Sequence, residues 1–214
     1  MKLCNSGNRQ KNPFPDKRPL FYYITDRRQL TGIDLIDCIR RAVDWGVDFI
    51  QIRERDLSDK ALYELACEAV TLARGKDCRI LINGRADIAL AAAADGVHLP
   101  STGLHISDIS SWIPKDFLVG VSVHSLTEAR LASEQAADYV LLGHIFPTKS
   151  KLSYGSPLGL DYLREVCSIA SIPVFGLGGM VRESIQPVLE SGAVGIAGIS
   201  LFQEAAMSKW QKFP

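Results

Sequence analysis

From about residue 20 onward, the sequence alternates short β-branched or aliphatic runs with longer stretches of helical period. Eight runs can be counted, and their starts are 18 to 33 residues apart, which leaves room for one crossover helix each and none for an inserted domain. The runs are Tyr22–Asp26, Asp48–Glu54, Cys78–Gly84, Gly96–Pro100, Leu118–His124, Tyr139–Phe146, Ile172–Met180 and Val194–Phe202. This alternation is typical of repeated parallel βα units.

The number of runs favours a closed architecture. Parallel strands joined by right-handed helical crossovers can close on themselves at eight, so we predict an α/β fold with a single (β/α)₈ TIM barrel over residues 20–214. An open doubly wound sheet is the alternative, but the Gly-x-Gly-x-x-Gly turn expected after its first strand is missing. Residues 1–19 are polar, carry three prolines and show no period, which predicts a flexible tail.

Two segments between the runs carry helix signals. Residues 58–74 place their apolar side chains on one stripe with charged side chains opposite, which predicts an amphipathic helix. Ser125 and Glu128 have the spacing of a capping box for a helix that starts directly after the fifth run. Gly192 follows the seventh helical stretch where a C-cap is expected.

Charge and composition exclude several classes of partner. Lys+Arg and Asp+Glu balance at 24 each, so there is no net positive field for nucleic acid. The longest uninterrupted aliphatic run, Ala89–Ala94, is far short of the roughly 18 residues of a membrane span. The first 19 residues show no secretory signal, and the five cysteines include no Cys-x-x-Cys pair. We therefore expect a cytoplasmic protein without disulfides or structural zinc.

The ends of the predicted strands are unusually polar. Catalytic groups of such barrels sit at the carboxyl ends of the strands, which makes these side chains candidates for substrate binding. They are Asp26, Gln51, Arg53, Arg55, Asn83, Arg85, His98, Ser122, His124 and His144.

Three of the four histidines lie at successive strand ends. His98 and His144 are flanked by apolar residues, so each can bind substrate or fill the barrel as a hydrogen-bonded core residue. His124 ends its run directly before the capping Ser125, so it should face the barrel mouth, and we predict it to be catalytic. His105 starts a helix and is expected to be solvated.

A second signal lies in the seventh and eighth units. Backbone N–H groups at glycine-rich loops beside a helix start form the phosphate cradle of many barrels, and Gly178, Gly179, Ile199 and Ser200 are the candidates here. The alternative is that these glycines only permit tight packing. Lys149 lies in the long connection Pro147–Pro157, which is either a lid over an anionic substrate or a solvated loop.

Several motifs stand together in a specific order. They are QIRERD, INGRADIALAAAADGVHL, VSVHS, YVLLGHIFPTKSK, PLGL, GLGGM and GIAGIS. With these motifs the chain resembles, from YYITD through Phe202, the family that contains thiamine phosphate synthase and the TenI-type thiazole tautomerase. The resemblance implies a barrel enzyme of thiamine biosynthesis whose partner is a small thiazole phosphate.

The two branches of that family differ in their need for a metal. Synthases of this family displace pyrophosphate with the help of Mg²⁺, and the resemblance implies one aspartate directly after the third-strand asparagine and another beyond the fourth-strand His-Leu pair. In this chain those places hold Gly84 and Gly103. We therefore predict no metal site and no cofactor, with Mg²⁺ required only if the synthase alternative holds.

The tautomerase branch is the better match, through NGRADIAL, HLPS and SVHSL. In its reaction a thiazole carboxylate phosphate with an exocyclic double bond becomes aromatic when one proton moves between two carbons, a task for a single group with a pKa near neutrality such as His124. The segment Pro147–Lys151 instead favours the synthase. A non-catalytic thiazole or thiamine phosphate-binding regulator and a homo-oligomer also remain open.

Overall fold

Eight parallel strands close into a barrel in the computed structural model, which describes residue 14, residues 19–148 and residues 155–207. The strands of this described part are β1 (Leu20–Ile24), β2 (Phe49–Ile52), β3 (Arg79–Asn83), β4 (Gly96–Leu99), β5 (Leu118–Val123), β6 (Tyr139–Gly143), β7 (Val174–Leu177) and β8 (Gly195–Gly198). Each strand pairs with the next along the chain, and Leu20 of β1 pairs with Gly195 of β8. This closure confirms the predicted (β/α)₈ barrel and excludes the open sheet.

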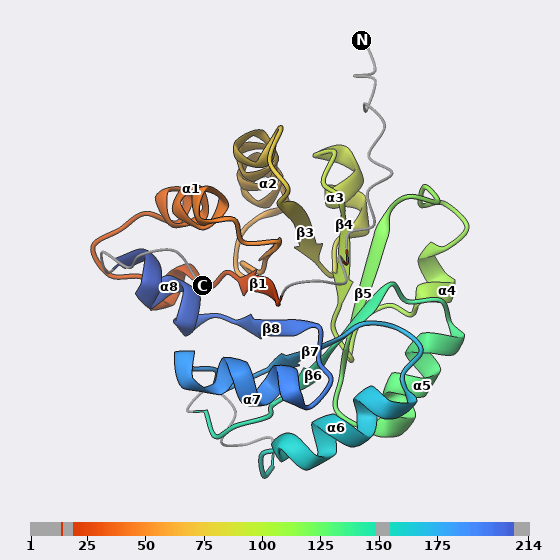
Figure 1. Cartoon of the computed structure of the whole chain (residues 1–214). Coiled ribbons are helices and arrows are strands. Elements are labelled where there is room, and N and C mark those ends of the chain that lie inside the picture. Colours follow the sequence, from red (N-terminus) through yellow and green to blue (C-terminus); the bar gives the residue numbers. More distant parts are fainter. Residues whose placement is uncertain (1–13, 15–18, 149–154, 208–214) are drawn as a thin grey trace.

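Helices follow the strands and form an outer ring around them (Figure 1). They are α1 (Leu35–Trp45), α2 (Asp59–Ala73), α3 (Ala86–Ala91), α4 (Ile106–Ile109), α5 (Leu126–Glu134), α6 (Gly159–Ile169), α7 (Ile185–Glu190) and α8 (Ser200–Met207), with 3₁₀ turns η1 (Arg27–Gln29) and η3 (Arg182–Ser184). Over the stretches that the structure describes, no helix combines the length and the apolar character needed to cross a membrane.

Two helix starts follow from hydroxyl caps. The Ser58 side chain accepts a hydrogen bond from the Ala61 amide at the start of α2, and Ser125 accepts one from the Glu128 amide at the start of α5. The Glu128 carboxylate accepts the His124 amide rather than the Ser125 amide, so only the serine half of the predicted capping box forms.

The boundaries of the first and the last strand differ from the predicted runs. The run Val194–Phe202 contains all of β8 and also the first turn of α8, because the apolar residues of strand and helix are contiguous in the sequence. The first strand begins at Leu20 rather than Tyr22 and ends before Asp26, whose carboxylate caps η1 instead. Gly192 takes a positive φ of 93° one residue after the C-cap of α7.

Two hydrophobic clusters stabilise the fold. The larger one fills the layer between the strands and the helices, and the smaller one fills the inside of the barrel. The buried members of the inner cluster are Leu20, Tyr22, Ile24, Phe49, Leu81, Tyr139, Leu141, Phe175 and Ala197. Four of these nine side chains are large aromatic rings that contact one another, so the barrel interior is a packed core at its amino end and not a channel.

Phe14 packs against the inner cluster from the amino end of the barrel. Its ring stacks on Phe49 with centroids 5.6 Å apart and lies 6.0 Å from Tyr139 and 6.4 Å from Phe175. Residues 1–13 and 15–18 lie outside the described residues, so the flexible tail over them stays a prediction. Phe14 nevertheless contributes to the core from within that segment.

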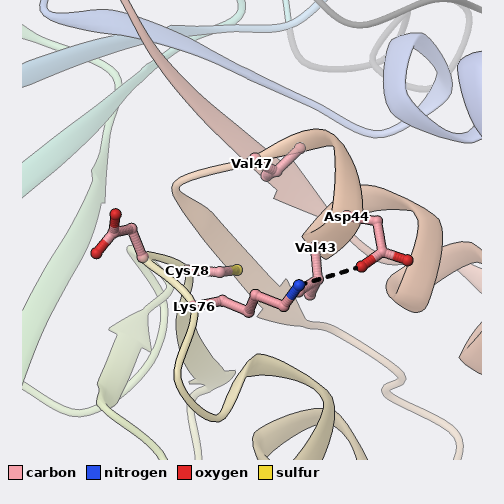
Figure 2. A pocket seen from close by; sticks show the side chains of 7 residues that line it. Val43, Asp44, Val47, Lys76 and Cys78 are labelled. Carbon is pink, nitrogen blue, oxygen red and sulfur yellow. Dashed lines mark ion pairs between the residues drawn. The ribbon is translucent and has the colours of Figure 1, made fainter.

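A cavity of about 230 Å³ also lies at the amino end (Figure 2). Its lining comes from the end of α1 and from the α1–β2 and α2–β3 connections, and the Lys76 ammonium lies 3.6 Å from the Asp44 carboxylate across it. In (β/α)₈ barrels the residues at the amino end usually contribute to stability, whereas the active site lies at the carboxyl end. The cavity is therefore separate from the polar strand ends.

We expect Phe14→Ala to lower the free energy of unfolding by about 1–2 kcal/mol, because a half-buried ring loses its apolar contacts and its aromatic partners. Urea denaturation followed by circular dichroism measures the change, with Phe14→Leu as the variant that keeps most of the apolar area. A Phe14→Ala protein as stable as the wild type would show that the segment does not contribute to the core.

Candidate active site

Four of the predicted residues meet at the carboxyl end of the barrel. The Gln51 amide on β2 donates to the Asn83 side-chain oxygen on β3 at 2.8 Å, and His98 Nε2 on β4 lies 2.8 Å from Ser122 Oγ on β5. Gln51 and His98 are buried, whereas Asn83 and Ser122 are half-buried and reach the mouth. The structure therefore brings these side chains together in two hydrogen-bonded pairs.

His98 is held neutral. Burial, and after it the positive charge of Arg53, lowers the pKa of the His98 imidazole to about 3. Its other nitrogen, Nδ1, lies 3.3 Å from the Tyr139 hydroxyl, so both ring nitrogens have partners. His98 thus has the geometry of a satisfied core histidine, and one hydrogen-bond partner, Ser122, extends toward the mouth.

Two arginines follow β2 and carry positive charge at the same end. Arg53 is half-buried, and burial together with the neighbouring Arg55 and Arg28 lowers the pKa of its guanidinium, which still remains charged at neutral pH. Among the described residues neither Arg53 nor Arg55 forms an ion pair, whereas Arg27 binds Glu54 and Asp56. Two uncommitted cations at the mouth suit an anionic ligand.

His124 lies at the rim and is exposed. Its Nδ1 contacts the carbonyl oxygen of Gly143, which can only accept, so this nitrogen carries the proton. Its Nε2 lies 3.4 Å from Ser101 Oγ. In a neutral imidazole this tautomer puts the lone pair on Nε2, which is the arrangement that a general base requires.

The remaining candidates occupy the β6, β7 and β8 ends. His144 follows β6 and is buried, and its Cβ would lie 2.5 Å from a Cβ added to Gly178. A Cβ on Gly179 would lie 2.6 Å from the Pro147 carbonyl oxygen, and both glycines have positive φ. Tight packing therefore requires the two glycines, whatever else they bind.

The other half of the predicted phosphate cradle is the start of α8. Ser200 is its first residue and is exposed, and Ile199 before it is half-buried. The first amides of a helix lack intrahelical partners, so they remain available to an anion. Lys149, the last predicted substrate-binding residue, lies outside the described residues.

The positions at which the resemblance implies aspartate ligands for Mg²⁺ hold Gly84 and Gly103. The Pro100 ring lies between the two positions in question, because an added Cβ would lie 3.6 Å from it at Gly84 and 3.0 Å from it at Gly103. The carboxylate of Asp87 is already engaged by Arg85 at 2.8 Å. Across residues 14, 19–148 and 155–207, no group of three or more His, Cys, Asp or Glu side chains could hold a metal ion. Gly84 and Gly103 therefore supply no side-chain oxygen to a cation at these two positions.

Tyr22 and Tyr139 were not among the predicted site residues, although they connect the two polar pairs. The Tyr22 hydroxyl donates to the side-chain oxygen of Gln51, Oε1, at 3.2 Å and lies 2.9 Å from the Tyr139 hydroxyl. No sequence pattern marked them, because β1 and β6 are buried along their whole length and apolar alternation does not separate the inside of the barrel from the outside.

A closed parallel (β/α)₈ barrel with buried polar side chains at the carboxyl ends of its strands has the architecture of the TIM-barrel enzymes. Comparison with known proteins identifies the particular family. The family model described as thiamine monophosphate synthase matches residues 21–202. The chain therefore belongs to the thiamine monophosphate synthase family.

Individual relatives agree with this assignment. A protein of Aquifex aeolicus is 42% identical over 186 residues, which cover 87% of this chain and 98% of that protein. A thiamine-phosphate synthase of Roseiflexus castenholzii is 36% identical over 188 residues, or 88% of this chain and 82% of that protein. The solved thiamine phosphate pyrophosphorylase of Pyrococcus furiosus superposes on this chain with a TM-score of 0.78 at 32% identity. The match covers 87% of this chain and 91% of that protein.

The depressed pKa of His98 makes stability depend on pH. In the unfolded chain the imidazole binds a proton below about pH 6.5, whereas the folded protein binds it only near pH 3, so stability falls as the pH drops between these values. We expect a loss of about 1.4 kcal/mol per pH unit from this group. Urea unfolding between pH 7 and 4 should give a steeper decline for the wild type than for His98→Gln, and equal slopes would contradict the buried, neutral state.

Proposed function

We propose that this chain catalyses the metal-independent tautomerisation of a thiazole carboxylate phosphate. The observation that carries the proposal is the pair of glycines at positions 84 and 103, with the Pro100 ring packed between them where a synthase is expected to have carboxylates. Pyrophosphate departure from a pyrimidine needs a divalent cation, whereas a proton shift within one heterocycle needs only an acid–base group.

His124 is the proposed acid–base group. Its Nε2 takes the proton from the ring carbon, and the electron pair of that C–H bond shifts into the ring as the exocyclic double bond becomes single. The same nitrogen returns the proton to the exocyclic carbon, so atoms and charge balance without another reactant. The Gly143 carbonyl oxygen accepts the hydrogen bond from Nδ1–H throughout and so stabilises the transient imidazolium.

The substrate's two anionic ends have separate candidates. Arg53 and Arg55, with no ion pair of their own in the described part of the chain, are proposed to hold the carboxylate. The amides at Gly178, Gly179, Ile199 and Ser200 are proposed to hold the phosphate. Holding both ends would fix the reacting carbons relative to His124, and positioning of this kind supplies much of the rate enhancement of a proton transfer.

Thiamine-phosphate synthase activity is the second candidate function. The activity for which the relatives are named favours it directly, and so does the lysine-containing segment Pro147–Lys151. A synthase of this sequence would have to hold Mg²⁺ without side-chain oxygens from positions 84 and 103, and its substrates' phosphate oxygens and water would supply ligands instead.

We expect the purified protein to convert the exocyclic thiazole carboxylate phosphate to its aromatic isomer in the presence of a chelator. His124→Gln should lower kcat by about 10²–10⁴-fold, the usual contribution of general acid–base catalysis, with an unchanged circular dichroism spectrum. His105→Gln is the matched control, since His105 is an exposed histidine after β4 outside the proposed site. Full activity of His124→Gln would remove this residue from the mechanism.

The two candidate functions separate in one assay. We expect no coupling of hydroxymethylpyrimidine pyrophosphate with thiazole phosphate when Mg²⁺ is added, measured as thiamine phosphate by chromatography. Coupling that depends on Mg²⁺ would establish the synthase instead. Binding of thiazole phosphate by calorimetry without either turnover would identify a regulator.

A further inference from the structure

A continuous series of hydrogen-bonded side chains, the hydrogen-bond chain, crosses the inside of the barrel. Its first and last members both lie at the barrel mouth. Its members, in order of contact, are Asn83, Gln51, Tyr22, Tyr139, His98 and Ser122. The four inner members are buried and the two end members are half-buried. Because buried polar groups need partners, the donors and acceptors along this chain constrain one another.

The direction of the chain is set at Gln51. Its amide nitrogen donates to the Asn83 oxygen at 2.8 Å, and its carbonyl oxygen accepts from the Tyr22 hydroxyl at 3.2 Å. A carbonyl oxygen can only accept, so the single proton of Tyr22 is committed to Gln51. The Tyr22 oxygen is then left as an acceptor.

The next contact follows from this commitment. The Tyr22 and Tyr139 oxygens are 2.9 Å apart, and only Tyr139 still has a proton to place between them. Burial raises the pKa of both phenols, so each keeps its one proton at any ordinary pH. Toward His98, the Tyr139 oxygen can therefore act only as an acceptor.

The tautomer of His98 is determined in the same way. Its Nδ1 lies 3.3 Å from the Tyr139 oxygen and must supply the proton of that contact. The ring is neutral, so Nε2 carries a lone pair and accepts the Ser122 hydroxyl proton at 2.8 Å. The Ser122 proton then points into the barrel and away from the mouth.

We propose that Tyr22 and Tyr139 are positioning residues that hold His98 as its Nδ1–H tautomer and thereby fix the hydrogen-bond polarity of the mouth. Ser122 presents only acceptor lone pairs there, and Asn83, whose oxygen is bound to Gln51, presents its amide N–H groups. A ligand must accordingly place a donor against Ser122 and an acceptor against Asn83. The inference goes beyond the proposed function, and its test requires no substrate.

The tautomer can be measured by long-range ¹H–¹⁵N correlation NMR on protein labelled with ¹⁵N-histidine, at pH 7. The chain has four histidines, and the signal set that disappears in His98→Gln assigns His98. We expect a protonated Nδ1 and an unprotonated Nε2 at this residue in the wild type. A protonated Nε2 would mean that the chain of hydrogen bonds runs in the opposite direction and would overturn the proposal.

Tyr22→Phe tests whether Tyr22 determines the His98 tautomer through Tyr139, because Tyr22 forms no hydrogen bond to His98 itself. Without the Tyr22 oxygen, the only acceptor left for the Tyr139 hydroxyl among these side chains is His98 Nδ1. A nitrogen that accepts carries no proton, so we expect His98 to switch to the Nε2–H tautomer. Tyr23→Phe is the matched control: Tyr23 is equally buried, but its hydroxyl contacts Cys38 and Gln203 outside the chain, and the tautomer should not change.

A packing role alone would leave the tautomer unaltered in both variants, since each keeps its ring. An Nδ1–H tautomer that persists in Tyr22→Phe would therefore refute the positioning role. If Tyr22→Phe does not fold, Gln51→Leu gives the same reading, because it removes the acceptor of Tyr22 and frees both phenol protons toward His98. We expect the switch to Nε2–H there too, and its absence would be equally decisive.

Discussion

The inside of a closed eight-stranded barrel has to be filled by side chains, and here the filling changes character along the barrel axis. The amino end holds packed rings: Tyr22 stacks on Phe49 with centroids 5.6 Å apart, and Phe175 packs edge-on against Phe49 with centroids 5.7 Å apart. The carboxyl end holds polar groups that need internal partners, because an unpaired buried polar group costs about 1–3 kcal/mol. Tyr22 and Tyr139 belong to both layers, with rings in the apolar part and hydroxyls in the polar part.

Glycines make this arrangement sterically possible. A Cβ on Gly120 of β5 would lie 2.0 Å from Tyr139 Cζ, so the phenol can cross the barrel only because this residue has no side chain. Gly178 and Gly179 likewise let the β7 loop lie against His144 and Pro147. The sequence pattern left open whether the loop glycines serve packing or phosphate binding. The structure demonstrates the packing requirement, and this does not remove the phosphate role, since a backbone without Cβ atoms also leaves its amides accessible.

The sequence predicted the strand number, the closure and most of the polar groups that meet. Gln51, Asn83, His98 and Ser122 are candidates because of their places at strand ends, and the structure joins them in two hydrogen-bonded pairs that the sequence did not predict. Tyr139 escaped this reasoning because strands of a parallel barrel are buried on both faces, so apolar alternation does not tell the inside from the outside. The packing of Pro100 between two glycines joins separate loops, which no local pattern reports.

Family membership determines the barrel more strongly than the reaction at its mouth. Relatives at 36–42% identity match this chain over 87–88% of its length, whereas metal-dependent chemistry depends on a few side chains, which the resemblance places in the loops after β3 and β4. In this chain those loops carry Gly84 and Gly103, which pack against the Pro100 ring, so neither position supplies a side-chain oxygen to a cation. The interior hydrogen bonds do not depend on these loops. Substitutions there can therefore change which reaction the mouth supports while the polarity of Ser122 and Asn83 stays the same.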